Sequence, residues 1–163
     1  FSDVFEEGGP ARQPFYGGFG LIAPGGIKKP SYYSFELFHK LGTTRIANPA
    51  DDVIVTRRED GSVVLAVWNL SPPAQHGTAR TFDLALTGRK VSKHAKMWRI
   101  DADHSNTLAA YERMGKPTYP TEKQVEQLNQ ESALAASESL EIKGGHLLLT
   151  LAANGFVLVE LKR

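Results

Sequence analysis

From residue 51 onward, apolar side chains recur at every second position, and this period constrains the fold more than any other feature of the chain. Segments 53–55 and 63–67 alternate apolar and other residues on either side of Glu59-Asp60-Gly61. Such alternation indicates β-strands with one buried face, and Asp-Gly between two strands is a strong hairpin signal. The sequence therefore predicts a β-hairpin at the start of a largely β region.

The same pattern continues to the end of the chain. The strands that we expect are 53–55, 63–67, 80–86, 95–100, 140–142, 146–151 and 155–161. Seven short strands separated by turns are typical of an antiparallel β-sandwich. Residues 102–134 interrupt the pattern with two short helices. One covers 108–114, and the other begins at a Thr121–Gln124 capping box and turns Val125 and Leu128 inward.

The first 50 residues are organised differently. Residues 1–29 are rich in glycine and aromatic residues, which predicts a long, ordered, functional loop with a short strand near 19–22. Pro30 then opens a helix that reaches Leu41, followed by Gly42 as its C′ residue. The apolar stripe that we expect on this helix comprises Tyr33, Phe35, Leu37, Phe38 and Leu41. A change of composition across 43–51 marks the expected domain boundary.

Composition excludes several classes of protein. The 163 residues are 41% hydrophobic and 23% charged, which is typical of a globular chain. A net charge of +1 argues against a dedicated nucleic-acid binder. The absence of cysteine excludes disulfides, thiolate zinc sites and a cysteine nucleophile, and no apolar run approaches the ~18 residues of a membrane span. The compartment is left open.

Asp3, Glu6 and Glu7 form a dense acidic cluster among aromatic residues. Carboxylates accept hydrogen bonds from sugar hydroxyls, and an aromatic ring covers the apolar face of a sugar. The cluster is thus a candidate sugar site, while a solvated acidic turn is the plainer interpretation. The residues alone leave both open.

Other polar and aromatic features are best interpreted as ordinary structural elements. Asp101, Asp103 and His104 have metal-ligand chemistry, but such a group at a strand end is more often a turn. Trp68 and Trp98 are expected to anchor the core rather than bind a ligand. Asn69-Leu70-Ser71 is formally a glycosylation sequon, a pattern that is common by chance. His39 is expected at the surface or at a helix cap.

Longer motifs carry a resemblance. FSDVFEE, then PFYGGFGLI, then IKKPSYYSFELFHKLG is similar to the end of the catalytic barrel in glycoside hydrolase family 39, the β-xylosidases. VVLAVWNL, WRIDADHSNTLAAYERMGKPTYPT and GFVLVELKR resemble later pieces of the same family, so the likeness runs through essentially the whole chain.

The resemblance implies a mainly β fold in two parts. Residues 1–46 would be the last strand-loop-helix unit of a (β/α)8 TIM barrel, and residues 47–163 an accessory β-sandwich with two short inserted helices. Members of the family are retaining enzymes with a Glu acid/base and a Glu nucleophile. Both lie upstream of the FSDVFEE motif in the family, so the resemblance places no catalytic residue in this chain.

The resemblance also assigns roles in substrate binding. Glu6 and Glu7 would hydrogen-bond to sugar hydroxyls, Glu7 above all, and Phe1 and Asp3 would shape the end of the barrel strand. The expected function is that of the C-terminal part of a retaining β-xylosidase, acting on terminal xylosyl residues of xylo-oligosaccharides. The α-L-iduronidases share the barrel, but the negative charge of FSDVFEE would repel a uronic acid.

The implied partners are a xylose or xylo-oligosaccharide substrate and the upstream barrel of the same protein, with no nucleic acid, membrane, metal or cofactor. A homo-oligomer stays open. Because the chain begins at Phe1 without an initiator Met, we expect that processing or truncation removed an upstream portion and that this chain alone is inactive. The alternative is a non-catalytic β-sandwich that binds carbohydrate or protein.

Overall fold

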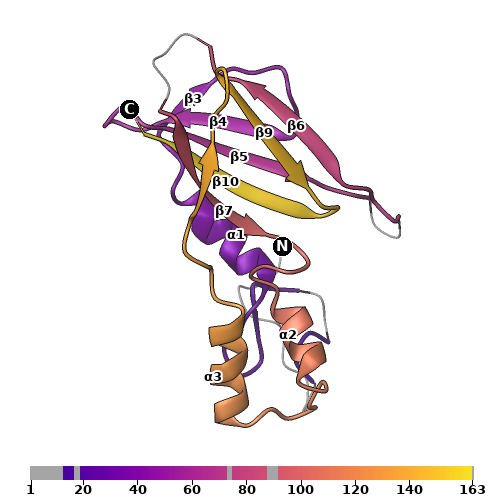
Figure 1. Cartoon of the computed structure of the whole chain (residues 1–163). Coiled ribbons are helices and arrows are strands. Elements are labelled where there is room, and N and C mark those ends of the chain that lie inside the picture. Colours follow the sequence, from indigo (N-terminus) through magenta and orange to yellow (C-terminus); the bar gives the residue numbers. More distant parts are fainter. Residues whose placement is uncertain (1–12, 17–18, 73–74, 88–91, 163) are drawn as a thin grey trace.

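The computed structural model describes residues 13–16, 19–72, 75–87 and 92–162, and Figure 1 shows how their helices and strands are arranged. The strands are β1 (Ile22–Ala23), β2 (Ile27–Lys28), β3 (Thr44–Ile46), β4 (Val53–Arg57), β5 (Val63–Asn69), β6 (Arg80–Ala85), β7 (His94–Ile100), β8 (Glu138–Glu141), β9 (His146–Leu151) and β10 (Gly155–Leu161). The helices are α1 (Pro30–Phe38), α2 (Thr107–Arg113) and α3 (Glu122–Glu131).

Strands β3 to β10 form two sheets that pack face to face, which we call the two-sheet body. A six-stranded sheet has the order β3-β4-β5-β10-β7-β8, and β6 pairs with β9 in a second sheet. Every pairing is antiparallel. Alternate residues of both sheets, such as Val67, Leu149 and Val159, meet in one buried cluster. The prediction of a mainly β, antiparallel chain is confirmed.

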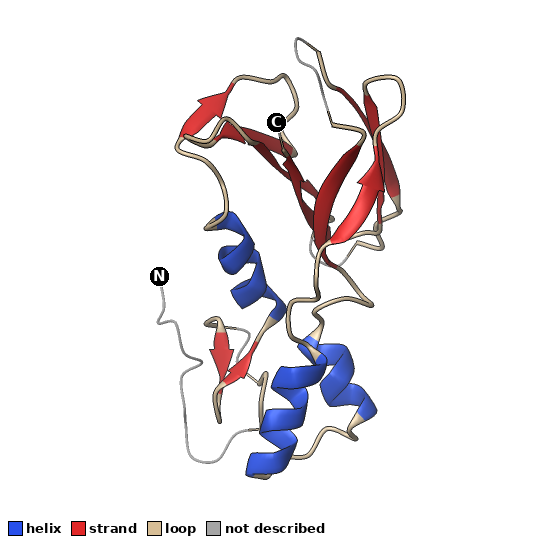
Figure 2. Cartoon of the chain, turned by 60° about the vertical axis from the view of Figure 1, so that its left-hand side comes forward, coloured by secondary structure: helices blue, strands red, loops and turns tan. Residues whose placement is uncertain are grey.

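The central strands β5 and β10 are buried on both faces. Leu65 and Val67 face the second sheet, whereas Val64 and Ala66 face α1 on the other side. In Figure 2, α1 lies below the two sheets and above a smaller group of elements that comprises β1, β2, α2 and α3. The continuous apolar runs of these strands therefore reflect three layers: α1, the six-stranded sheet and the β6–β9 sheet.

Helix α1 is shorter than predicted. It begins at Pro30 as expected but ends at Phe38, with His39 as the exposed C-cap residue. Gly42 has a packing role instead of a capping one, because a Cβ there would lie 2.2 Å from the carbonyl oxygen of Arg57. The expected stripe is also wrong at one residue: Phe35 is 62% exposed.

Three short strands refine the predictions for the first 50 residues. The strand expected near 19–22 begins only at Ile22, as β1, and pairs with β2 in a hairpin. Strand β3 lies within the segment 43–51, where we expected a boundary, and pairs with β4 at the edge of the large sheet. The sheet therefore begins at Thr44. The division at residues 46 and 47 stays a prediction.

The hairpin β1–β2, α2 and α3 form a separate cluster that we call the small lobe (residues 13–16, 19–29 and 102–134). The buried residues of its hydrophobic cluster are Ala23, Ile27, Ala110, Tyr111 and Leu128. Both predicted helices are present. Asn106 caps α2 through its side chain, and the Thr121–Gln124 capping box is formed in both directions.

Candidate functional site

The residues predicted to bind sugar, Phe1, Asp3, Glu6 and Glu7, lie outside the described residues. The structure describes residues 13–16 and 19–29, which follow them in the chain, and the helices α2 and α3 that contact this segment.

The β1–β2 hairpin turns at Pro24-Gly25. Gly26 N–H donates to the Ala23 carbonyl over 3.1 Å, and Gly25 has a φ of +87°. Proline followed by a glycine of positive φ is the pattern of a type II turn. The turn places Ala23 and Ile27 side by side, and both are almost completely buried against α2 and α3.

Lys29 links the glycine-rich segment to α1. It is 8% exposed and occupies the N-cap position of the helix. Its ammonium donates to the Phe19 carbonyl, and its backbone N–H donates to the Leu21 carbonyl over 2.9 Å. A buried ammonium requires hydrogen-bond acceptors, so Lys29 holds residues 19–21 against the start of α1.

Phe15 is the first described aromatic residue after the acidic segment in the sequence. Its ring meets that of Tyr111 on α2 edge-on, with the centroids 5.1 Å apart. Burial raises the pKa of the Tyr111 phenol above its ordinary value of 10.0. The phenol is therefore protonated at neutral pH, and it donates to the Pro117 carbonyl over 2.8 Å. Phe15 itself has a φ of +66°, which is rare for a bulky residue.

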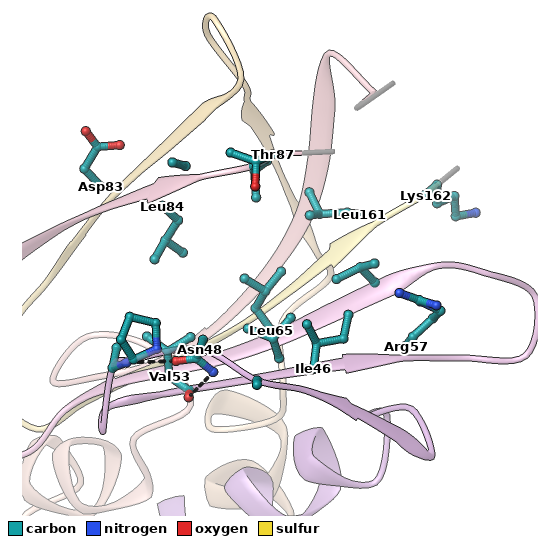
Figure 3. Close-up of a pocket in the computed structure, with 17 residues that line it drawn as sticks. Ile46, Asn48, Val53, Arg57, Leu65, Asp83, Leu84, Thr87, Leu161 and Lys162 are labelled. Atoms are coloured by element: carbon teal, nitrogen blue, oxygen red, sulfur yellow. Dashed lines mark hydrogen bonds between the residues drawn. The ribbon is translucent and has the colours of Figure 1, made fainter. Parts of the chain in front are cut away.

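A cavity of about 680 Å³ opens elsewhere, between the large sheet and β6 (Figure 3). Leu65, Leu84 and Leu161 line it from three different strands. Asn48 closes one end, where its side chain donates to the Val53 carbonyl (3.2 Å) and accepts from Ala50 N–H (3.0 Å).

The lining of this cavity does not suit glycoside hydrolysis. None of its described lining residues is aromatic, and Asp83 is the one acid among them. The Asp83 carboxylate contacts His146 Nδ1 at 2.7 Å. A retaining glycosidase needs two carboxyl groups about 5 Å apart. The cavity is therefore an apolar gap between the sheets.

Asp101, Asp103 and His104 form a turn. One oxygen of Asp101 accepts from the backbone N–H groups of Asp103 (2.9 Å) and His104 (3.0 Å) and contacts His104 Nδ1 at 2.7 Å. Burial alone would raise the pKa of Asp101, but hydrogen bonds from His104 and Asp103 hold that pKa below 3.8. The carboxylate thus serves the end of β7, as the plainer reading predicted.

The sequon asparagine has a structural role. Asn69 is 6% exposed, and its side-chain amide donates to the carbonyls of Thr78, Leu151 and Ala152 over 2.9–3.1 Å. An amide enclosed in this way joins the ends of β5 and β9. It is not available for glycosylation in the folded chain.

Trp68 and Trp98 pack against the cluster under α1, and Lys40 Nζ lies 5.5 Å from the centre of the Trp98 ring. The prediction that both anchor the core is confirmed. None of the described helices is long and apolar enough to cross a membrane.

Comparison with known proteins agrees with the motif resemblance. The model of Glycosyl hydrolases family 39 matches residues 1–145. This chain belongs to glycosyl hydrolases family 39. The match includes the acidic segment, the small lobe and strands β3 to β8, and it ends before β9.

Two curated relatives are β-xylosidases. The one from Geobacillus stearothermophilus is 31% identical over 165 residues, which is 100% of this chain and 32% of that protein. The one from Caldicellulosiruptor saccharolyticus is 33% identical over 140 residues, which is 82% of this chain and 28% of that protein. The chain thus spans about a third of the length of these relatives.

A solved structure gives the same result. The family 39 β-xylosidase of Caulobacter crescentus superposes with a TM-score of 0.77 at 29% identity, over 100% of this chain and 34% of that one. The likeness therefore includes the small lobe as well as the sheets.

Proposed function

We propose that this chain forms the C-terminal part of a retaining β-xylosidase that removes terminal β-D-xylosyl residues from xylo-oligosaccharides. The observation that carries the proposal is the end-to-end likeness of the chain to a β-xylosidase three times its length. The acid/base and nucleophile glutamates would lie in the portion upstream of Phe1.

In this proposal the chain divides into two functional parts. Residues 1–46 complete the (β/α)8 barrel, and residues 47–163 form an accessory β-sandwich that supports it. Exposed aromatic residues support this division, because Tyr16, Phe19 and Phe35 are each at least 60% exposed in the N-terminal part. Such rings suit contact with the remaining barrel.

Glu6 and Glu7 would accept hydrogen bonds from xylose hydroxyls, with Phe1 and Asp3 shaping the end of the strand. A neutral pentose fits an acidic loop better than a uronic acid does, because like charges repel. The chemistry itself would come from the upstream carboxyl pair.

The first experiment compares the 163-residue chain with the protein that includes the upstream portion. We expect hydrolysis of an aryl β-xyloside by the longer protein and none by the chain alone. Turnover by the pure chain would refute the placement of the catalytic residues upstream. A longer protein that binds xylo-oligosaccharide without hydrolysis would instead support a binding module.

A second experiment tests the substrate-binding residues. In the longer protein, Glu7→Ala should lower kcat/KM by about 10- to 150-fold, because losing a charged hydrogen bond costs about 1.5–3 kcal/mol. Glu126→Ala is the matched control, since Glu126 is an exposed glutamate of the small lobe. Equal kinetics for the two variants would remove Glu7 from the site.

A further inference from the structure

Strand β6 has an open edge. It pairs with β9 alone among the described strands, and Leu86 N–H, just beyond β6, continues the pairing with a 2.8 Å bond to the Gly145 carbonyl. In an antiparallel pair, residues that bond to the partner strand alternate with residues whose backbone groups point the other way. Thr81, Asp83 and Ala85 therefore direct their N–H and carbonyl groups away from β9.

The cavity of about 680 Å³ lies on this open side of β6. Its described lining comes from β3, β4, β5, β6, β10 and the adjoining connections, and none of it belongs to β9. Val55 and Val63 in this lining are only partly buried, whereas Leu65 and Val67 of the same sheet are almost completely buried. Protein interiors hold few voids larger than a water molecule. The inner face of the large sheet is thus uncovered where a third strand would lie beside β6.

The lining of the cavity specifies the chemistry of such a strand. A segment paired along the six residues of β6 would turn about three side chains inward. Leu84 and Leu161 line the cavity and favour apolar side chains there. Arg57 and Lys162 lie at one end of it in Figure 3, and their charges favour an acidic residue at that end. The fitting occupant is an extended segment with alternating apolar residues and one acid.

A second copy of this chain fits the cavity poorly. Two β6 strands that paired at their open edges would bring Phe82 and Leu84 of one copy beside those of the other. These side chains already pack in the core of their own copy. They cannot also fill the cavity of a neighbour.

The rest of a longer protein is a better source of the strand. This chain spans 32% of the β-xylosidase from Geobacillus stearothermophilus and 34% of the one from Caulobacter crescentus. Most of the length of such a protein therefore lies outside the segment that resembles this chain. A strand from that remainder is covalently linked to the body, which raises its effective concentration at the cavity.

We propose that an extended strand from the upstream portion of the same protein adds to the open edge of β6 and fills the cavity. Its backbone would pair with Thr81, Asp83 and Ala85, and its alternate apolar side chains would contact Val55 and Val63. The second sheet would then have three strands, and β6 would no longer be an edge that other chains can pair with. This inference rests on the proposed function, which makes the chain part of a longer protein.

Amide hydrogen exchange, measured in the chain alone and in the longer protein, tests the proposal. The amides of Thr81, Asp83 and Ala85 should exchange about tenfold or more slowly in the longer protein, because each gains a hydrogen bond. Leu148 and Thr150 are the matched control, since their N–H groups point to the opposite edge of the same sheet. Equal exchange of the β6 amides in both proteins, or equal slowing at both edges, would overturn the inference.

A substitution that fills the cavity should act differently in the two proteins. Val55→Phe adds apolar volume to the cavity, so in the chain alone it should keep or raise the urea midpoint. In the longer protein it should lower that midpoint, because it would overpack against the added strand. Ile54→Phe is the control, since Ile54 packs toward α1 on the other face and should respond alike in both proteins. A Val55→Phe effect of the same sign in both would contradict the proposal.

Hydrolysis of an aryl β-xyloside, measured on the same samples, separates this inference from the proposed function. Slow exchange of the β6 amides in a longer protein without hydrolysis would support the strand and refute the function. Hydrolysis with unchanged β6 exchange would refute the strand and leave the function in place. Protection of β6 that rises with the concentration of the chain alone would identify a second copy as the occupant and overturn the proposal.

Discussion

The two-sheet body and the small lobe are stabilised in different ways. The body buries apolar residues from β4, β5, β6, β7, β9 and β10 in a continuous cluster. The hydrophobic cluster of the lobe has five buried residues, and the lobe also depends on side chains that bond to backbone, above all Asn129 and Thr107. Apolar burial is additive and non-directional, whereas these hydrogen bonds specify the position of one short segment.

The two regions therefore have different roles in the fold. Functional loops are drawn from regions of low local stability, because they must be shaped by a few contacts and must adapt to ligand. In this chain residues 19–29, which follow the predicted sugar-binding residues in the sequence, belong to the lobe, while the body contains the larger apolar core. Helix α1 joins the two and packs on the body through Tyr33 and Leu37.

The largest expected effect comes from a matched pair of core truncations. Leu147 in β9 and Leu128 in α3 are both 0% exposed. Leu147→Ala should cost about 2–5 kcal/mol and lower the urea midpoint of the whole chain. Leu128→Ala should unfold the lobe at a lower urea concentration and leave the urea midpoint of the sheets unchanged. Equal shifts of one common transition would show that body and lobe are a single cooperative unit.

The second expected effect lies at one end of the body. Asn69→Ala should destabilise the chain by about 2–3 kcal/mol, since three carbonyls, one of them buried, lose their shared donor. Asn69→Asp should cost more, because a carboxylate would face those carbonyls. Asn48→Ala, at the rim of the cavity, is the control and should cost less. Chemical denaturation of the three variants provides the measurement.

A smaller effect is expected within the lobe. Thr121→Ala removes the capping box of α3 and should cost about 1 kcal/mol. The loss should appear as faster amide exchange in α3 and at Lys28, with the sheets unaffected. Thr118→Ala changes an exposed threonine of the same loop and serves as the control. Faster exchange of the sheet amides as well would show that the lobe and the sheets do not unfold separately.

The smallest expected effect depends on pH and lies where the body meets the lobe. The folded-state pKa of Asp101 is below 3.8, so its carboxylate stabilises the fold above that pH and loses its contribution as the pH falls through the folded pKa. Asp101→Asn should therefore cost about 0.5–1 kcal/mol at neutral pH, and less as the pH falls below 3.8. Denaturation midpoints of both proteins across this range provide the measurement. If the difference between the two denaturation midpoints did not change with pH, the role assigned to the Asp101 carboxylate would be wrong.

Several elements could be predicted from the sequence because their causes are local. The alternation in 63–67, the turn at Asp60-Gly61 and the capping box at Thr121 each lie within a few residues, and each is present in the structure. The acidic motif and the glycine-rich segment after it likewise identified the family by residue order alone. Glu6 and Glu7 stay predictions.

Other features depended on contacts between distant residues. Helix α1 ends before Leu41, and Gly42 is needed where the chain meets the backbone of Arg57. Phe35 leaves the predicted stripe because the sheet contacts Tyr33 and Leu37 instead. No local pattern at Asn129 or Asn69 indicated what their side chains hold, since an amide's partners are set by whichever backbone lies beside it.

The sequence by itself determined the mainly β class, the helices and the family, since periodicity, capping and motif order are properties of neighbouring residues. Only the tertiary structure decided that α1 covers the large sheet and that Asn129 and Thr107 bond to the backbone of the β1–β2 hairpin. The physical reason is range: a side-chain hydrogen bond acts over about 3 Å, and which chain segments come that close depends on the packing of the whole fold.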